Sequence, residues 1–138
     1  KDFIPENSII WESAYCNGSS GRVFEELGFN VIHKDRDYFN WEPEEYTIQI
    51  TNPPFTIKKE WIKRAMELGK PWIMIMPEGT LSTNYFKEYV GNKIQLIIPR
   101  RINFDKVVGN NVVGTTSASF RCFFYCYGLN LPNDLNFI

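Results

Sequence analysis

The tetrapeptide Asn-Pro-Pro-Phe at positions 52–55 constrains the fold of this 138-residue chain more than any other feature. It directly follows the strand-like run 46–51, and a segment with helical spacing comes after it. The apolar residues at that spacing are Ile57, Trp61, Ile62, Ala65 and Leu68. We expect Thr56 to cap this helix, Gly69 to close it and Pro71 to prevent its continuation. The tetrapeptide is therefore predicted to form a stiff turn at the carboxyl end of a strand.

The residue types in this turn suit a planar amine. Pro53 and Pro54 fix φ and donate no backbone hydrogen bond, so the carbonyl oxygens of Asn52 and Pro53 are free to face a ligand. The Asn52 amide oxygen and the Pro53 carbonyl can accept both hydrogens of an exocyclic NH2 group, and Phe55 can stack on the ring that carries it. A sulfonium methyl donor is already activated and needs mainly positioning, so the turn favours methyl transfer to nitrogen. The alternative is a plain turn between a strand and a helix.

Strand-like and helix-like segments alternate along the rest of the chain. Strands are expected over residues 8–11, 30–33, 71–76, 93–98 and 117–127. This alternation predicts an α/β fold with a doubly wound Rossmann-like sheet, mostly parallel. The polar stretch 34–45 is too short for a strand-helix unit, so the third unit is minimal or missing. Residues 106–116 form the longest irregular stretch and are a candidate lid.

Length and composition predict one domain over 1–138, and the start at Lys1 is compatible with the loss of an N-terminal segment. The net charge of −1 gives no global attraction to nucleic acid, so such binding needs a local basic patch. Cys16, Cys122 and Cys126 show neither zinc spacing nor a disulfide framework, which favours a reducing, intracellular location and predicts no metal site. No apolar stretch reaches membrane-spanning length.

With Glu12 at the end of the first strand and a glycine-containing loop after it, the chain resembles a known family. Residues 52–55 resemble the catalytic motif of class I adenosylmethionine-dependent methyltransferases that act on amino nitrogens, most closely the phage and large-virus N6-adenine DNA methyltransferases. The resemblance extends over about residues 9–104. It includes residues 10–21, similar to the family's cofactor loop, and residues 28–35, similar to its second strand and the acid that ends it. It implies the fold predicted above and S-adenosyl-L-methionine as the cofactor.

The resemblance also implies roles for individual residues. The catalytic residues would be Asn52, Pro53, Pro54 and Phe55. The cofactor-binding residues would be Glu12, Ala14, Cys16, Gly18, Asp35, Asp37 and Tyr38. The family pattern has an acid, three residues, Gly, one residue and Gly; here Cys16 stands at the first Gly position and Ser13 replaces a frequent Pro.

Two acids follow the second strand. Asp35 is placed to accept from the cofactor's ribose hydroxyls, and Asp37 with Tyr38 or Phe39 resembles the family's adenine-contacting step. Either acid can instead be a solvated loop charge.

The resemblance makes adenine in DNA the expected substrate. Arg100 and Arg101 follow a strand on the same side of the sheet and can hold phosphates, although a solvated pair is the alternative. We expect nucleic acid as the partner, with a partner subunit or a homodimer, and no membrane. A virus-encoded chain would act in the host cytoplasm, the nucleus or the virion. Two other functions stay open: methylation of RNA or of a protein glutamine amide, and a catalytically degenerate domain that serves in assembly.

Overall fold

The computed structural model describes residues 3–14, 24–34, 36–99, 104–108, 111–116 and 122–138, and of Phe55, 104–108 and 111–116 it describes the backbone alone. The strands of its main sheet are β1 (Ile9–Trp11), β2 (Asn30–Ile32), β3 (Ile48–Thr51), β4 (Trp72–Pro77), β5 (Ile94–Ile98), β8 (Cys122–Tyr127) and β9 (Leu135–Phe137). A separate pair comprises β6 (Phe104–Val108) and β7 (Asn111–Thr116). The helices described over their whole length are α2 (Lys58–Leu68) and α3 (Asn84–Tyr89), with 3-10 turns η1 (Phe55–Ile57), η2 (Glu78–Ser82) and η3 (Gly91–Lys93). Residues 24–26, before β2, are also helical.

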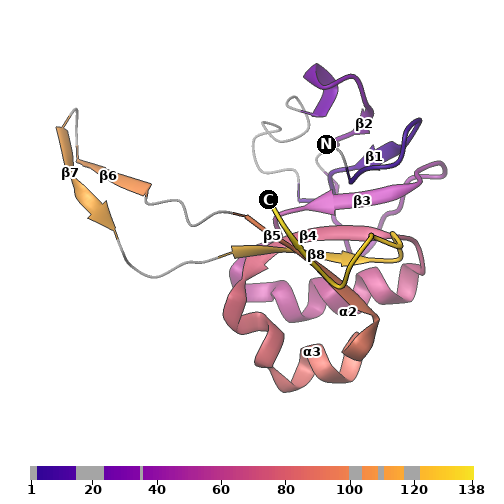
Figure 1. The fold of residues 1–138 in the computed structure, drawn as a ribbon. Coiled ribbons are helices and arrows are strands. Elements are labelled where there is room, and N and C mark those ends of the chain that lie inside the picture. Colours follow the sequence, from indigo (N-terminus) through magenta and orange to yellow (C-terminus); the bar gives the residue numbers. More distant parts are fainter. Residues whose placement is uncertain (1–2, 15–23, 35, 100–103, 109–110, 117–121) are drawn as a thin grey trace.

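The seven strands have the order β2-β1-β3-β4-β8-β5-β9 (Figure 1). All neighbouring pairs are parallel except those of β8, which runs antiparallel to both β4 and β5. Strand order reverses between β1 and β3, because the chain moves outward from β1 to β2 and then returns past β1. This confirms the predicted doubly wound, mostly parallel Rossmann-like sheet.

The third strand-helix unit of such a sheet is missing here. β2 lies at the edge of the sheet, and none of the described residues between β2 and β3 is in a strand. The reason is local: this polar, acidic connection offers few apolar residues to cover another strand. Instead, Tyr38 and Tyr46 turn inward and join the core beside Trp11.

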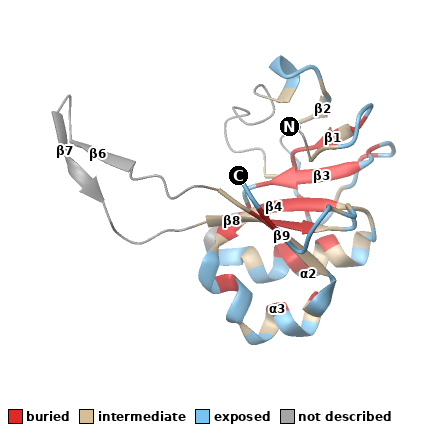
Figure 2. Ribbon diagram, in the orientation of Figure 1, coloured by how far each residue is buried: buried red, intermediate tan, exposed pale blue. Residues whose placement is uncertain are grey.

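The two faces of the sheet have separate cores. Figure 1 shows α2 and α3 together on one face, and the cluster beneath them includes Trp11, Trp72 and Tyr125, each at most 1% exposed. The opposite face buries β-branched residues, among them Ile48 and Ile50. Figure 2 shows the consequence: the central strands are buried on both sides while the outer faces of the helices are exposed.

Two local expectations were wrong, and one strand was not expected. Thr56 does not cap α2, because a 3-10 turn over Phe55–Ile57 precedes the helix and no side chain caps it. The described residues of the stretch 106–116 are not irregular: β6 and β7 pair as an antiparallel ribbon that projects from the sheet (Figure 1). β9 was not predicted at all, since three residues after a proline-containing loop carry too little pattern; it is fixed by pairing with β5.

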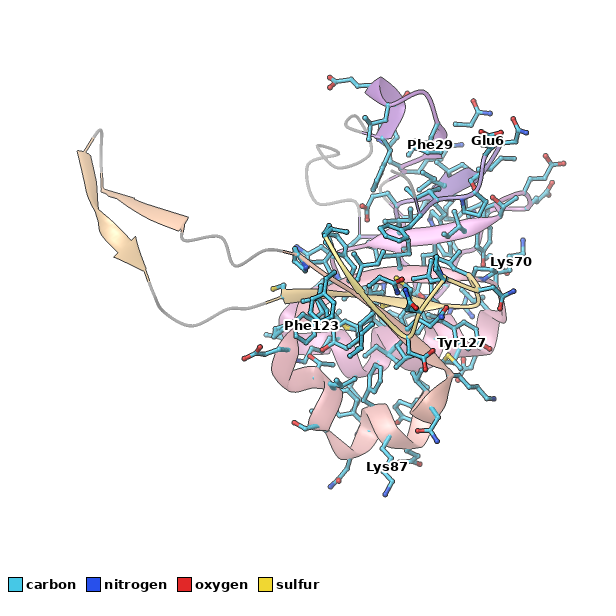
Figure 3. All side chains as sticks on the ribbon, viewed as in Figure 1. Glu6, Phe29, Lys70, Lys87, Phe123 and Tyr127 are labelled. Atoms are coloured by element: carbon cyan, nitrogen blue, oxygen red, sulfur yellow. The ribbon has the colours of Figure 1, made fainter. Side chains whose placement is uncertain are left out.

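The carboxyl ends of the parallel strands share one edge of the sheet. Phe123 lies opposite Met76 near the end of β4, and Tyr127 lies opposite Trp72 at its start. In Figure 3 Phe123 accordingly marks the side from which the β6–β7 ribbon departs, whereas Tyr127 and Lys70 mark the opposite side. The candidate site therefore lies on the same side as the ribbon.

Candidate active site at the carboxyl ends of β1 and β3

Parallel pairing brings Glu12 and Thr51 together although 39 residues separate them. Trp11 is opposite Gln49 in the register of β1 and β3, so the residues that follow β1 lie beside the end of β3. On the side of β2, the Glu12 N–H continues the hydrogen-bond ladder between the strands and donates to the Ile32 carbonyl at 2.9 Å. The strand order thus places the end of the first strand next to the turn that begins at Asn52.

Glu12 is a buried acid held by two donors. Glu12 is only 2% exposed. The Thr51 hydroxyl donates to Oε1 at 2.5 Å, and the Ala14 N–H donates to the same oxygen at 3.2 Å. Burial raises the pKa of Glu12 to about 7, although both hydrogen bonds work against the rise. Within the described residues, no cationic side chain forms an ion pair with Glu12.

A second buried network supports the loop after Glu12. The Ser13 hydroxyl oxygen accepts from Gln49 Nε2 at 2.7 Å and from Trp61 Nε1 at 3.1 Å. The Tyr38 hydroxyl donates to Gln49 Oε1 at 3.2 Å, and its ring stacks on Trp61 with centroids 4.0 Å apart. A proline at position 13 would leave two buried donors without this acceptor. Ser13 therefore has a structural role here.

The turn at 52–55 presents Asn52 to solvent. Asn52 is exposed, Pro53 is buried, and Pro54 is exposed with φ −57° and ψ 130°. Within the described part of the chain the Asn52 amide has no hydrogen-bond partner, so it is available to a ligand. Phe55 begins η1, and its side chain is outside the description.

The other predicted site residues fall into two groups. Asp37 is exposed, and its carboxylate accepts from the Phe39 N–H at 3.0 Å and from the Asn40 side chain, so it shapes a turn. Tyr38 is 2% exposed and engaged in the core, which leaves Phe39, 38% exposed, as the accessible aromatic of the pair. The remaining predictions concern residues outside the described ranges. These are Cys16, Gly18, Asp35, Arg100 and Arg101.

Sequence reasoning missed Thr51 and Gln49. Both are at most 2% exposed although they are polar, and they share one face of β3. The signal was present in the run Ile-Gln-Ile-Thr, where two polar residues alternate with isoleucines in a strand that must be central. A buried polar residue at the carboxyl end of such a strand needs a partner, and this requirement points to the site.

Other features of the described residues lie apart from this constellation. A cavity of about 580 Å³ runs along β2, lined by residues that include His33, Trp41 and Glu44 but none of the turn at 52–55. Groups of three or more potential metal ligands are not found in the described part of the chain. None of its described helices is long and apolar enough to cross a membrane.

Comparisons with known proteins give a likeness to a solved structure. Neither a protein-family model nor a curated protein matches the chain. Among solved structures, the chain is similar to a protein from Thermoplasma acidophilum described as a "putative methyltransferase", with 12% identity and a TM-score of 0.45. The match covers 94% of this chain and 60% of that one. The strand order given above defines the class of the fold.

Proposed function

We propose that this chain is an adenosylmethionine-dependent methyltransferase domain that acts on an exocyclic amino nitrogen, with N6 of adenine in DNA as the substrate. One observation carries the proposal. The exposed amide of Asn52 directly follows Thr51, whose hydroxyl is bonded to the buried carboxylate of Glu12. A group for the substrate amine and a group for the cofactor are thus joined at one edge of a doubly wound sheet, where such folds bind ligands.

The residues present fit the cofactor. Adenosylmethionine carries an ammonium group on its methionine moiety, and it supplies a methyl group on an activated sulfonium. Glu12 offers a carboxylate at the expected edge, and the described residues provide it with no cation of their own. A buried acid with a raised pKa and no cationic partner is typical of a functional site. Glu12 would hold the ammonium, with the Ala14 backbone beside it.

The turn would bind and orient the amine. The Asn52 amide oxygen and the Pro53 carbonyl accept the two hydrogens of the NH2 group, which turns the nitrogen lone pair away from conjugation with the ring. Pro54 keeps this turn stiff because its φ is fixed. Catalysis by such a site depends mainly on positioning.

The choice of adenine in DNA comes from the resemblance of residues 52–55 to the viral family. A paired adenine hides its amine within the duplex, so the base would have to be extruded or single-stranded. Phe55 and the exposed Phe39 are the aromatic residues that would stack on flat rings near the site. RNA and protein glutamine amides remain alternative substrates of the same turn.

Asn52→Ala tests the proposal. We expect methyl transfer to adenine-containing oligonucleotides to fall by at least about a hundredfold, a loss typical of one removed transition-state contact. Adenosylmethionine binding by calorimetry and the melting temperature should hardly change, because Asn52 is exposed and bonds to no described residue. Asn92→Ala, at an equally exposed asparagine on η3, is the matched control.

Three outcomes separate the candidates. Loss of transfer with retained cofactor binding supports the proposed role of Asn52. Substantial transfer by the purified variant would remove Asn52 from the mechanism. Failure of the wild-type chain to bind adenosylmethionine at any pH would favour the catalytically degenerate domain.

A further inference from the structure

Thr51 occupies a singular position between the two halves of the proposed site. It is the last residue of β3, 1% exposed, and the next residue is Asn52. Its hydroxyl donates to Glu12 Oε1 at 2.5 Å and accepts from the Ala14 N–H at 3.0 Å. The Thr51 side chain therefore contacts both Glu12 and the backbone of Ala14 in the loop that follows. The Thr51 backbone continues directly into the turn at Asn52.

The direction of these bonds is determined by their donors. The Thr51 hydroxyl carries one proton, which it donates to Glu12, while its oxygen accepts from the Ala14 N–H. Glu12 Oε1 thus accepts from two donors, the Thr51 hydroxyl and the Ala14 N–H. Within the described residues this leaves Oε2 as the oxygen that can take a proton or face a cationic ligand.

We propose that Thr51 is a positioning residue for the cofactor: its hydroxyl holds the Glu12 carboxylate in its charged form and ties it to the strand that ends at the catalytic turn. This inference rests on the proposed function, since it assumes that Glu12 receives the cofactor's ammonium. Thr51 acts through Glu12 and touches neither substrate nor cofactor in this role.

The surroundings of Glu12 explain why Thr51 influences the pKa of this carboxyl group. Burial raises the pKa of Glu12, and the Thr51 hydroxyl is the largest influence that lowers it, followed by the Ala14 N–H. Two titratable groups on neighbouring elements have other contacts. His33, after β2, lies 2.6 Å from Glu25 through Nε2, and the Tyr38 hydroxyl donates to Gln49. Among the described residues, the balance between neutral and charged Glu12 is thus set chiefly by burial and one hydroxyl.

The test uses Thr51→Val, which removes the hydroxyl and keeps the shape. Hydrogen bonds to charged groups are strong enough that their loss should move the Glu12 titration upward by about one pH unit or more. Carbon-13 NMR of labelled glutamate carboxyl groups in the ligand-free chain reports this directly. Calorimetry across pH should show the acidic limb of adenosylmethionine affinity displaced by the same amount, or about tenfold weaker binding at pH 6 per unit of displacement.

The chain contains a matched control. Thr47 precedes β3 at the opposite end, and its hydroxyl oxygen likewise accepts from β1, from the Ile9 N–H at 2.7 Å. Thr47→Val should change neither the Glu12 titration nor the pH dependence of adenosylmethionine affinity. Thr51→Ser should match the wild type in both measurements because it keeps the hydroxyl. If Thr51→Val does not fold, Thr51→Ala serves the same measurement.

The outcomes are distinguishable. An upward shift with Thr51→Val that Thr51→Ser reverses supports the inference. This inference alone would be overturned if Thr51→Val binds adenosylmethionine with an unchanged pH dependence of affinity. A Glu12 titration that does not move in Thr51→Val would overturn it as well. Absence of adenosylmethionine binding by the wild-type chain at every pH would overturn the proposed function and this inference with it.

Discussion

At the scale of single residues, the burial of Glu12 makes the stability of the chain depend on pH. Burial raises the pKa of Glu12 from the ordinary value of 4.5 to about 7 in the folded chain, so the folded state holds the proton more tightly. The stability gained from this proton is fully present below pH 4.5 and is lost as the pH rises through 7. Functional sites commonly carry such a cost.

Glu12→Gln should remove this pH dependence. Between pH 4.5 and 8, the free energy of unfolding of the variant should rise relative to that of the wild type by about 3 kcal/mol, because each pKa unit corresponds to about 1.4 kcal/mol. Urea unfolding at a series of pH values measures the difference. Glu67→Gln, at an exposed position of α2, controls for the loss of a charge. A constant difference between Glu12→Gln and wild type across this range would show that Glu12 is ionised without penalty.

At the scale of elements, α2 shows which local signals are sufficient to predict the bounds of a helix. Its apolar spacing and its end at Gly69 were predicted from sequence, and the structure confirms both. Gly69 adopts φ 75°, in the left-handed region that residues with a Cβ atom avoid. Its start was predicted less well, because the turn at 52–55 continues into η1 before the helix begins.

Gly69→Ala should destabilise the chain by about 1 kcal/mol, the cost of placing a Cβ atom in this conformation. A steric clash is not involved, since an added Cβ would meet no atom within 4 Å. Gly79→Ala is the matched control: it has equal space, and its φ lies outside the left-handed region. Melting curves compare the two. Equal melting temperatures for both variants would contradict the role assigned to the left-handed conformation of Gly69.

At the scale of the whole molecule, charge limits what the chain can do alone. With a net charge of −1, nonspecific attraction to a nucleic-acid backbone is weak. The β6–β7 ribbon projects from the edge of the sheet that carries the site, and a two-stranded ribbon is a shape that a major groove admits. Its neutral composition of Asp105, Lys106 and uncharged residues adds no attraction of its own.

We therefore expect the isolated chain to bind duplex DNA weakly, with a shallow salt dependence, and to need a partner subunit or a second copy for specific recognition. Replacing both Arg100 and Arg101 by alanine should weaken the remaining binding equally for all sequences. The slope of log K against log salt should fall by up to about 2. Fluorescence anisotropy over a salt series measures this. A tight, sequence-selective complex with the monomer at physiological salt would contradict the expectation.

The sequence by itself determined the features that depend on neighbouring residues. The alternation of strands and helices, the left-handed end of α2 and the stiff turn at Asn52 follow from local spacing, glycine and proline, so they could be predicted without any knowledge of contacts. The tertiary structure alone decided which distant residues meet. The bond between Thr51 and Glu12, the acceptance of two donors by Ser13, the reversed direction of β8 and the edge position of β9 all depend on strand order and register. Such pairings join residues dozens of positions apart, and no local pattern specifies them, because they are fixed only when the whole sheet is assembled.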